Sequence, residues 1–439
     1  MHENTFRDGR QGNPRAPAGW SGRVAGCYRF AVNFPPFRTY PLRWIAPAAA
    51  LAGVTVTLAQ RLDPMQNPDS IAFMALARSV LEGHGLRYQE PLIPGLDLYA
   101  FRAPGYPLFL AAVTALGGTG LAVAAQGALN GLSAALLGDV ALRLGGGPAA
   151  AWIAFAMRLL WFKAWWYSGL LLSETLFEFL GVLATWLALR AAERRAAPWA
   201  AGAGAVTAWA VLCRPVGLGL ALAIGAWLTF RFPRGAAAFA LAAVLLWAPW
   251  PVRNALVLGA PVPFTTNGGG TAWAGTTDGN VRPAYDWMGA HVHLGELGFD
   301  RHFRDLARDN IRRAPGAALR ATAQRAFVYL GPIRGRTPEL WLHRFAMVMA
   351  LVALGLAAAR ARLVLPGAIW AAQGAMMAPI FLIDRYRFPT DWCVVLAAAI
   401  GITALADRLG PRRAALATGA ALAACVAGSW LLSLGARTG

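Results

Sequence analysis

The stretch QNPDSIAFMALARSVLEGHGL, residues 66–86, directly follows the first long apolar run of the chain. A carboxylate stands near its start at Asp69, and apolar residues then recur along one face at Ile71, Met74, Ala77 and Leu81. This spacing predicts a helix that opens on an acid. The rest of the chain must explain why a helix that opens on an acid lies directly after a long apolar run.

The composition indicates a membrane protein. Hydrophobic residues make up 57% of the 439 positions and charged residues 14%, and the mean hydropathy is +0.46. Repeated apolar runs, rather than one water-soluble core, account for such values. Residues 1–42 are polar and Arg-rich, without a short apolar segment and small-residue cleavage site, so we expect a cytoplasmic tail followed by a span that stays as an anchor.

The net charge of +19 comes from arginines that cluster between apolar runs. The clusters fall at every second loop, as the positive-inside rule predicts for cytoplasmic loops, so we expect no nucleic-acid partner. The four cysteines are isolated and predict neither a disulfide framework nor a zinc site. The clusters are Arg143; Arg190, Arg194 and Arg195; Arg231 and Arg234; Arg360 and Arg362; and Arg408, Arg412 and Arg413.

Apolar runs near the length of a membrane span recur along the chain. A helical span needs about 20 apolar residues, and about eleven runs qualify. They predict an all-α polytopic membrane protein of about 11 transmembrane helices with a cytoplasmic N-terminus. The runs are 43–60, 119–142, 148–167, 171–190, 198–213, 216–230, 235–252, 341–359, 363–383, 389–406 and 414–434.

Two longer segments fall on the outer side of this topology. Residues 61–118 form the first, in which YPLFLAAVTALGG at 106–118 is too short to cross and is predicted to be a re-entrant or interfacial helix. Residues 253–340 form the second, with a Gly/Thr loop at 265–280 and soluble helices near 300–313 and 316–330. The predicted domains are therefore the tail 1–42, a transmembrane module 43–252, the outer segment 253–340, and transmembrane helices 341–439.

Ionisable side chains gather at the predicted outer ends of spans, where each is costly unless it is paired or faces a wet cavity. This gathering suggests a polar reaction chamber on the outer side. Asp63, Arg158, Lys163, Arg214, Asp384 and Asp391 belong to the group, together with the candidate site residues Asp69, Arg102, Glu174, Arg253, Arg385 and Arg387.

Each main candidate also has a plain structural interpretation. Asp69 suits the N-cap of its helix, and Glu174 suits the helix dipole as a first-turn carboxylate. Arg385 and Arg387 offer forked donors for phosphate but also stand near the acids at 384 and 391. Arg214 is also an ordinary snorkelling residue at the interface.

Six motifs, taken in order, resemble the polyprenyl-phosphate-sugar-dependent glycosyltransferases of the GT-C fold. The pattern is similar to protein O-mannosyltransferases and the lipid A aminoarabinose transferase. Departures occur at Ser70, where many relatives have a second acid, and at Arg102 and Ala103, where the aminoarabinose transferase has Glu-Lys. The motifs are NPDS at 67–70, FRAPGYPLFLAAV at 101–113, LLSETLF at 171–177, RPVGL at 214–218, TTNGG at 265–269 and DRYRFP at 384–389.

The resemblance implies a membrane enzyme that transfers a sugar from a polyprenyl phosphate to an acceptor hydroxyl, on the outer side of a bacterial inner membrane and with inversion. The helix at Asp69 and the short helix at 106–118 are then juxtamembrane helices, which answers why an acid opens the first one. Asp69 acts as base and Glu174 as a second acidic position. Donor phosphate is assigned to Arg385, Arg387, Arg102 and Arg253, and substrate contacts to Asn267, Trp273 and Tyr106.

The expected partners are the polyprenyl-phosphate-linked sugar, a glycan, lipid or protein acceptor, and membrane lipids. We expect no cofactor and no metal, because a lipid monophosphate leaving group lacks the diphosphate charge that a metal balances. A transporter or flippase of an anionic glycolipid is the alternative and would use the same arginines. Such proteins often contain related halves or broken helices, and we find no clear internal repeat. A scaffold protein would leave Asp69 and Glu174 unexplained as a pair.

Overall fold

The computed structural model describes residues 39–89, 95–277, 291–330, 340–380 and 384–434. Apart from a two-stranded ribbon, β1 (Tyr88–Gln89) paired antiparallel with β2 (Asp97–Leu98), the regular structure in these ranges is helical. The expected all-α architecture is thus confirmed except for this ribbon, which pairs residues within the first outer segment.

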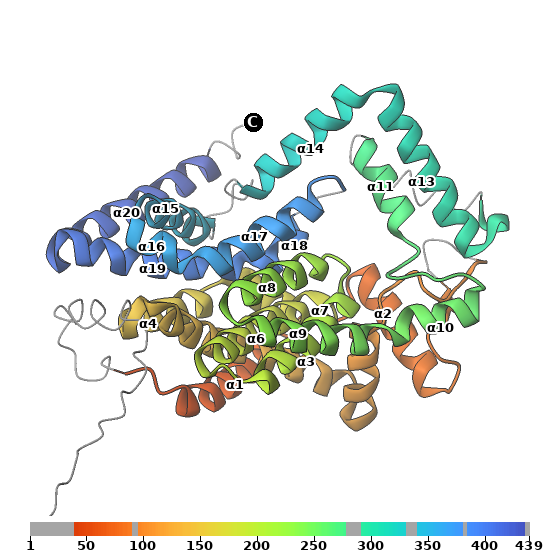
Figure 1. Cartoon of the computed structure of the whole chain (residues 1–439), viewed down its shortest axis with the longest axis horizontal. Coiled ribbons are helices and arrows are strands. Elements are labelled where there is room, and N and C mark those ends of the chain that lie inside the picture. Colours follow the sequence, from red (N-terminus) through yellow and green to blue (C-terminus); the bar gives the residue numbers. More distant parts are fainter. Residues whose placement is uncertain (1–38, 90–94, 278–290, 331–339, 381–383, 435–439) are drawn as a thin grey trace, which may run out of the picture.

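The helices of the N-terminal half pack into one bundle (Figure 1). The chain reverses between α3 and α4 at Gly145 and Gly147, whose φ values of 81° and 77° suit glycine. The bundle consists of α1 (Leu42–Ala59), α3 (Gly105–Ala141), α4 (Gly147–Leu159), α5 (Phe162–Ser168), α6 (Ser173–Arg194), α7 (Ala197–Cys213), α8 (Gly217–Arg231) and α9 (Pro233–Trp247), and α10 (Pro249–Leu258) extends from the end of α9 away from it (Figure 1).

A second group of helices follows the outer segment and packs on the first. The long helix α19 connects the two groups, since it contacts α4 and α3 as well as α15 and α20. The members are α15 (Trp341–Gly355), α16 (Ala357–Arg362), α17 (Val364–Met377), α18 (Asp384–Arg387), α19 (Asp391–Leu409) and α20 (Pro411–Leu434).

Among the described residues, five helical stretches are long and apolar enough to cross a membrane: Leu42–Ala59, Gly105–Leu159 (which includes α3 and α4), Ser173–Arg194, Pro233–Leu258 (α9 and α10) and Arg385–Leu409. The chain is therefore a multi-pass membrane protein, while the predicted number of about eleven spans stays a prediction. Three predicted runs are not single helices. The run 148–167 breaks at Leu160 and Trp161, and the run 235–252 divides at Ala248, ahead of Pro249. The run 341–359 breaks at Leu356, whose backbone is extended.

The short helix predicted at 106–118 is present and ends where its apolar run ends. Inside α3 the backbone leaves helical geometry at Gly117 and Gly118, and Gly118 has φ 66° and ψ −164°. This region of backbone space is open essentially to glycine alone. The two glycines therefore separate the short helix from the long one that follows.

The long part of α3 crosses α1 at very close range. Gly127 and Gly131 face the backbone of α1, and a Cβ added at Gly131 would lie 1.9 Å from the carbonyl oxygen of Ala49. Small residues permit such an approach between membrane helices. The crossing fixes the outer end of α1 next to the start of the long part of α3.

We expect Gly131→Val to destabilise the chain by about 3 kcal/mol, because the added Cβ must push the two backbones apart. Thermal unfolding in detergent measures the change. Gly120→Ala is the matched control, since a Cβ at Gly120 meets no atom within 4 Å. Equal unfolding temperatures for the two variants would show that the helices separate freely.

Contacts join four of the five arginine-bearing loops that were predicted to be cytoplasmic at one end of the bundle. Arg143 pairs with Glu193, Arg195 donates to the carbonyl of Arg231 at 3.5 Å, and Arg362 packs beside Gly145. These contacts join the loops after α3, α6, α8 and α16. The same-side relation that the charge pattern predicted for these loops is therefore present in the fold.

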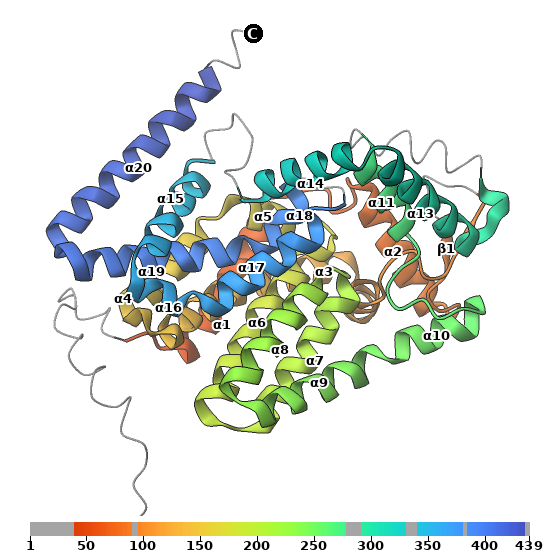
Figure 2. The same ribbon diagram turned by 45° about the horizontal axis from the view of Figure 1, so that its top comes forward.

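The outer segments form a small second core at the other end. It is built from α2 (Pro68–Leu81), α11 (Gly268–Thr276) and α13 (Gly295–Arg313), and α14 (Pro315–Leu330) follows. Figure 2 shows these helices and β1 side by side, away from α20. The helices α13 and α14 confirm that helices occur near 300–313 and 316–330, while their soluble character stays a prediction. The core contains Leu76, Tyr88, Leu98, Phe101, Phe299 and Phe303.

The predicted Gly/Thr loop at 265–280 is wrong over residues 268–276, which are helical as α11. Its glycines allow α11 to pack closely on α13, since a Cβ at Gly269 would lie 2.0 Å from the carbonyl oxygen of Asp300. The Gly269 amide also donates to Asp300 Oδ1 at 2.7 Å. Tertiary contact thus overrides the low helix propensity of glycine.

One buried carboxylate joins the two outer segments. Glu296, in the first turn of α13, accepts hydrogen bonds from the backbone amides of Tyr99 at 2.7 Å and Ala100 at 2.8 Å. Its Oε1 also accepts a hydrogen bond from the Thr266 hydroxyl. The loop that leads to Arg102 is therefore held by α13, although nearly 200 residues separate them.

Candidate active site

Asp69 lies in the first turn of α2, but its side chain does not cap the helix. The N-cap is Asn67, whose Oδ1 accepts a hydrogen bond from the Asp69 amide at 3.0 Å. Pro68 occupies the first helical turn, where its missing N–H costs nothing. The interpretation of Asp69 as the cap is therefore wrong, and its carboxylate is free to face other groups.

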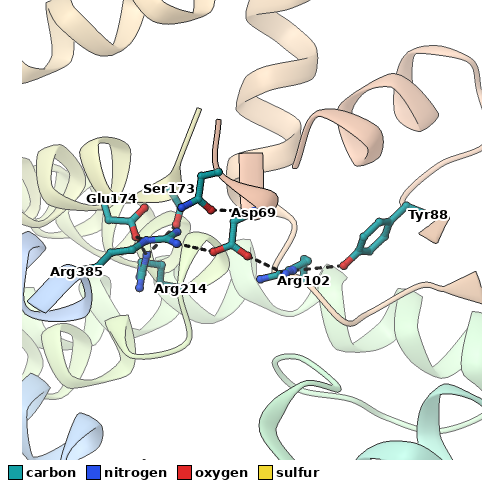
Figure 3. A network of polar contacts seen from close by, with 8 residues as sticks. Asp69, Tyr88, Arg102, Ser173, Glu174, Arg214 and Arg385 are labelled. Atoms are coloured by element: carbon teal, nitrogen blue, oxygen red, sulfur yellow. Dashed lines mark hydrogen bonds and ion pairs between the residues drawn. The ribbon is translucent and has the colours of Figure 1, made fainter. Parts of the chain in front are cut away.

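Two arginines from distant parts of the chain contact the Asp69 carboxylate. Arg102 Nη2 lies 2.9 Å from Asp69 Oδ1, and Arg385 Nη1 lies 2.6 Å from Asp69 Oδ2. Arg102 comes from the loop before α3 and Arg385 from α18, so α2, the first outer loop and the C-terminal group meet at this point (Figure 3).

Glu174 lies beside this pair in the first turn of α6, with a side chain that is 0% exposed. Arg385 Nε donates to Glu174 Oε1, and Arg214 Nη1 lies 2.9 Å from the same oxygen. Arg214 also donates to the Ser173 hydroxyl at 3.0 Å. Arg385 thus bridges the two carboxylates, and the predicted pair of acids is brought together by a shared guanidinium (Figure 3).

The cluster of Asp69, Glu174, Arg102, Arg214 and Arg385, here named the acid–arginine cluster, contains two carboxylates and three guanidiniums. With the carboxylates ionised it carries one net positive charge, and Glu174 Oε2 is buried without a hydrogen-bond partner among the described residues. A guanidinium presents several donors in a fixed fork. The arrangement is therefore suited to receive a further anion and a hydroxyl donor.

Arg102 is held in place by its surroundings. Its Nε donates to the Tyr88 hydroxyl at 3.3 Å, and its guanidinium lies 5.5 Å from the centre of the Phe101 ring and 5.8 Å from that of Phe73. Cation–π contact at these distances is favourable. The ribbon β1–β2 and α2 therefore position this arginine against Asp69.

The arginines keep Asp69 ionised. Burial raises the pKa of the Asp69 carboxyl, but the charges of Arg102, Arg385 and Arg214 outweigh burial and lower this pKa from 3.8 to about 2. Without a further ligand, Asp69 is thus a carboxylate across the physiological pH range and a weak proton acceptor.

This lowered pKa predicts an acid-dependent loss of stability. Because the folded-state pKa lies below the unfolded one, the Asp69 contacts stabilise the fold above about pH 4 and lose that contribution as the pH falls towards 2. The loss is about 2 kcal/mol. Unfolding temperatures of wild type and Asp69→Asn between pH 6 and pH 2.5 test it, and parallel curves for the two proteins would contradict the assignment.

Arg387, two residues from Arg385, lies in a different cluster. Its side chain is 2% exposed, its Nε lies 3.2 Å from Asp391 Oδ1, and its Nη2 lies 2.8 Å from His343 Nε2. The pairing with Asp391 that the sequence left open is therefore present. These contacts hold the peptide that presents Arg385.

Three other predicted site residues contact groups outside the acid–arginine cluster. Arg253 donates to the carbonyls of Tyr99 at 2.7 Å and Leu86 at 2.9 Å. The Trp273 ring packs 5.3 Å from that of Phe303 in the outer core. Asn267 accepts a hydrogen bond from Thr265 at 2.7 Å at the start of α11.

Tyr106 is fully buried beneath α2. Its hydroxyl donates to Gln126 Oε1 at 2.7 Å, and its ring packs edge-on against Phe73 at 5.0 Å. Gln126 in turn donates to the carbonyls of Ser168 and Leu170. Tyr106 therefore supports the segment that leads into Glu174.

Two features of the site were not among the predicted site residues. Arg214 was noted only as an outer cation, although it follows a span directly, opposite Ser173 and Glu174. Glu178 forms a separate buried ion pair, with Arg158 Nε 2.8 Å from its Oε1. Within the described ranges, no three His, Cys, Asp or Glu side chains are grouped so that they could hold a metal ion.

No protein-family model matches the chain, and no curated protein matches its sequence. Solved structures of the oligosaccharyltransferase AglB from Archaeoglobus fulgidus do match. One, in complex with an inhibitory peptide and a dolichol-phosphate, is 12% identical with a TM-score of 0.52, over 90% of this chain and 56% of AglB. Another, tethered to an acceptor peptide, is 14% identical with a TM-score of 0.53, over 90% and 55%.

The chain has the GT-C fold. It spans about half the length of the AglB chains that it matches. ArnT from Cupriavidus metallidurans, bound to undecaprenyl phosphate, is 15% identical over 83% of this chain and 78% of that one, with a TM-score of only 0.37. The acid–arginine cluster lies at the end of this GT-C bundle that is opposite the arginine-rich loops.

Proposed function

We propose that this GT-C protein is a membrane glycosyltransferase that moves a sugar from a polyprenyl phosphate to an acceptor hydroxyl. The observation that carries the proposal is the acid–arginine cluster, in which Arg385 joins Asp69 and Glu174 at the end of the bundle opposite the arginine-rich loops. On the positive-inside rule, that end faces away from the cytoplasm.

The arginines bind the donor phosphate. Arg102 and Arg385 contact Asp69 and hold their guanidiniums at the mouth of the cluster, with side chains 13% and 15% exposed. A phosphate that binds to them replaces part of their ion pairing with the Asp69 carboxylate. The net positive charge of the acid–arginine cluster attracts this phosphate. One AglB structure of the same fold was solved with a dolichol-phosphate, which agrees with a lipid-phosphate donor.

Asp69 acts as the general base. Once the donor phosphate shares Arg102 and Arg385, the charges that lower the Asp69 pKa are partly neutralised, so the carboxylate becomes a better proton acceptor. It takes the proton of the acceptor hydroxyl as the oxygen attacks the anomeric carbon. The bond between that carbon and the phosphate oxygen breaks on the opposite face, so the configuration inverts.

The same arginines stabilise the departing phosphate, on which negative charge grows in the transition state. Glu174 does not contact the reacting atoms in this scheme. Its carboxylate pairs with Arg385 and Arg214, so that both guanidiniums are oriented before the substrate binds. Of the other predicted phosphate ligands, Arg387 holds the peptide around Arg385, and Arg253 holds the loop before Arg102.

A turnover assay tests the proposal. The purified protein in liposomes receives a panel of labelled polyprenyl-phosphate sugars and a membrane extract as acceptor source, and liposomes without protein serve as the blank. We expect free polyprenyl phosphate and labelled acceptor from one donor. Movement of intact donor lipid between leaflets without transfer would support the transporter alternative. The absence of both transfer and movement would refute the proposed function.

A further inference from the structure

A hollow of about 290 Å³ lies outside the acid–arginine cluster, where the outer end of α1 meets the start of the long part of α3. Its walls are largely apolar and include Leu58, Leu62 and Val123, and Arg61 is the cation among the residues that line it. The volume is at the small end of the range for ligand sites. The hollow has room for a headgroup and the first part of a chain.

Arg61 is an unusual residue for its position. It follows the C-cap of α1 with φ +50°, in the left-handed region that normally selects glycine at this place. The conformation costs about 1 kcal/mol. Within the described part of the chain, the exposed Arg61 guanidinium makes no hydrogen bond or ion pair with another side chain, so no described side chain neutralises its charge.

The hollow lies at the level where lipid hydrocarbon gives way to headgroups. On α1, a candidate membrane span, Leu51 is 69% exposed and Leu58 is 47% exposed. Two residues further, Gln60 donates to the carbonyl of Trp165 at 3.0 Å, and Trp166 is 38% exposed. Exposed aliphatic residues suit the bilayer core, and Trp suits its interface. A ligand of the hollow therefore comes from the membrane.

We propose that this hollow binds a phosphate-bearing membrane lipid, whose phosphate lies on Arg61 and whose first chain atoms lie against Leu58, Leu62 and Val123. The fork of a guanidinium suits phosphate oxygens, and the apolar walls suit an acyl or prenyl chain. The site is separate from the acid–arginine cluster and requires no sugar transfer.

A backbone hydrogen bond joins the lipid site to the catalytic end. The amide of Leu171 donates to the carbonyl of Pro64 at 3.1 Å. Pro64 borders the hollow and lies on the segment that leads into α2 and Asp69, while Leu171 precedes Glu174 by three residues. A bound lipid therefore supports the segments that present both acids.

Native mass spectrometry of the purified protein in detergent measures the lipid stoichiometry. The probes are phosphatidylglycerol, a C55 polyprenyl phosphate, phosphatidylcholine as a zwitterionic phospholipid, and inorganic phosphate. We expect wild type to bind one phosphatidylglycerol and two polyprenyl phosphates, one of them at the catalytic end. Arg61→Ala should weaken phosphatidylglycerol binding about tenfold and leave one polyprenyl phosphate, whereas Arg61→Lys should retain most of the binding.

Two further variants keep the test decisive. Gly120→Leu fills the hollow, and a Cβ at Gly120 meets no atom within 4 Å, so we expect a folded protein that no longer retains the lipid. Arg78→Ala removes an exposed arginine of α2 and should bind lipid as wild type does. Wild-type binding by Arg61→Ala and Gly120→Leu would overturn the proposal. Retention of inorganic phosphate in place of lipid would overturn it too.

The outcome is independent of glycosyl transfer. If the proposed function fails, wild type binds one polyprenyl phosphate rather than two. The binding of phosphatidylglycerol and its dependence on Arg61 are then unchanged. If the lipid site fails instead, Arg61→Ala binds phosphatidylglycerol normally while donor turnover persists.

Discussion

Asp69→Asn is expected to lower sugar transfer by about a thousandfold, a loss typical of removing a general base, while the protein stays folded and binds donor lipid. The amide keeps the size of the carboxylate and part of its hydrogen bonding to Arg102 and Arg385, but it cannot accept the hydroxyl proton. Release of polyprenyl phosphate measures the rate, and retention of donor on the detergent-solubilised protein measures binding.

Asp63→Asn is the matched control, because Asp63 lies on the same outer segment but is exposed, and its carboxylate accepts a hydrogen bond from the Met65 amide at 2.9 Å. It should turn over as wild type does. Equal rates for Asp69→Asn and wild type would place the base elsewhere. A variant that loses donor binding together with turnover would assign Asp69 to substrate positioning instead.

Arg385→Gln is expected to lose both stability and activity. The substitution leaves the buried carboxylate of Glu174 with Arg214 as its remaining cation and removes one of the two cations of Asp69. Removing one partner of a buried ion pair costs about 3–5 kcal/mol. Thermal unfolding in detergent should show this loss, and turnover should fall below detection because the donor phosphate loses its principal ligand.

A double substitution separates the two effects. Adding Glu174→Gln to Arg385→Gln removes the uncompensated charge and should restore most of the stability without restoring turnover. The pair of Arg158 and Glu178, buried in the same bundle, is the control. The double variant Arg158→Gln with Glu178→Gln should regain both the stability and the turnover that either single variant loses. Recovery of turnover in the Arg385 and Glu174 double variant would remove Arg385 from the donor site.

Hydropathy predicted where apolar helices occur but not where they break. A window of about 20 residues averages over single positions, so hydropathy did not predict the interruptions at Leu160 and Trp161, at Ala248 or at Leu356. The break at Gly117 and Gly118 was predicted because it ends an apolar run. The helix α11 was missed because its stability comes from contact with α13 rather than from its own glycine-rich sequence.

The site was predictable in its acids and less so in its arginines. Asp69, Glu174 and Arg385 were predicted and meet in space. Arg387 has the same chemistry in the same motif, yet its side chain enters the cluster of Asp391 and His343, because the turn of α18 directs two neighbouring arginines to different sides. No spacing rule decides this, since the direction depends on which helices surround a four-residue element.

The hydrogen bonds of Glu296 to Tyr99 and Ala100 bear on how this protein can be recombined. The first outer loop and the segment 253–340 are separate in sequence, which invites their exchange one at a time with those of other GT-C proteins. Because one carboxylate from the later segment satisfies the backbone of the earlier loop, a chimera that replaces only one of them leaves two amides without an acceptor. Transplants that aim to change the acceptor should therefore carry both segments together.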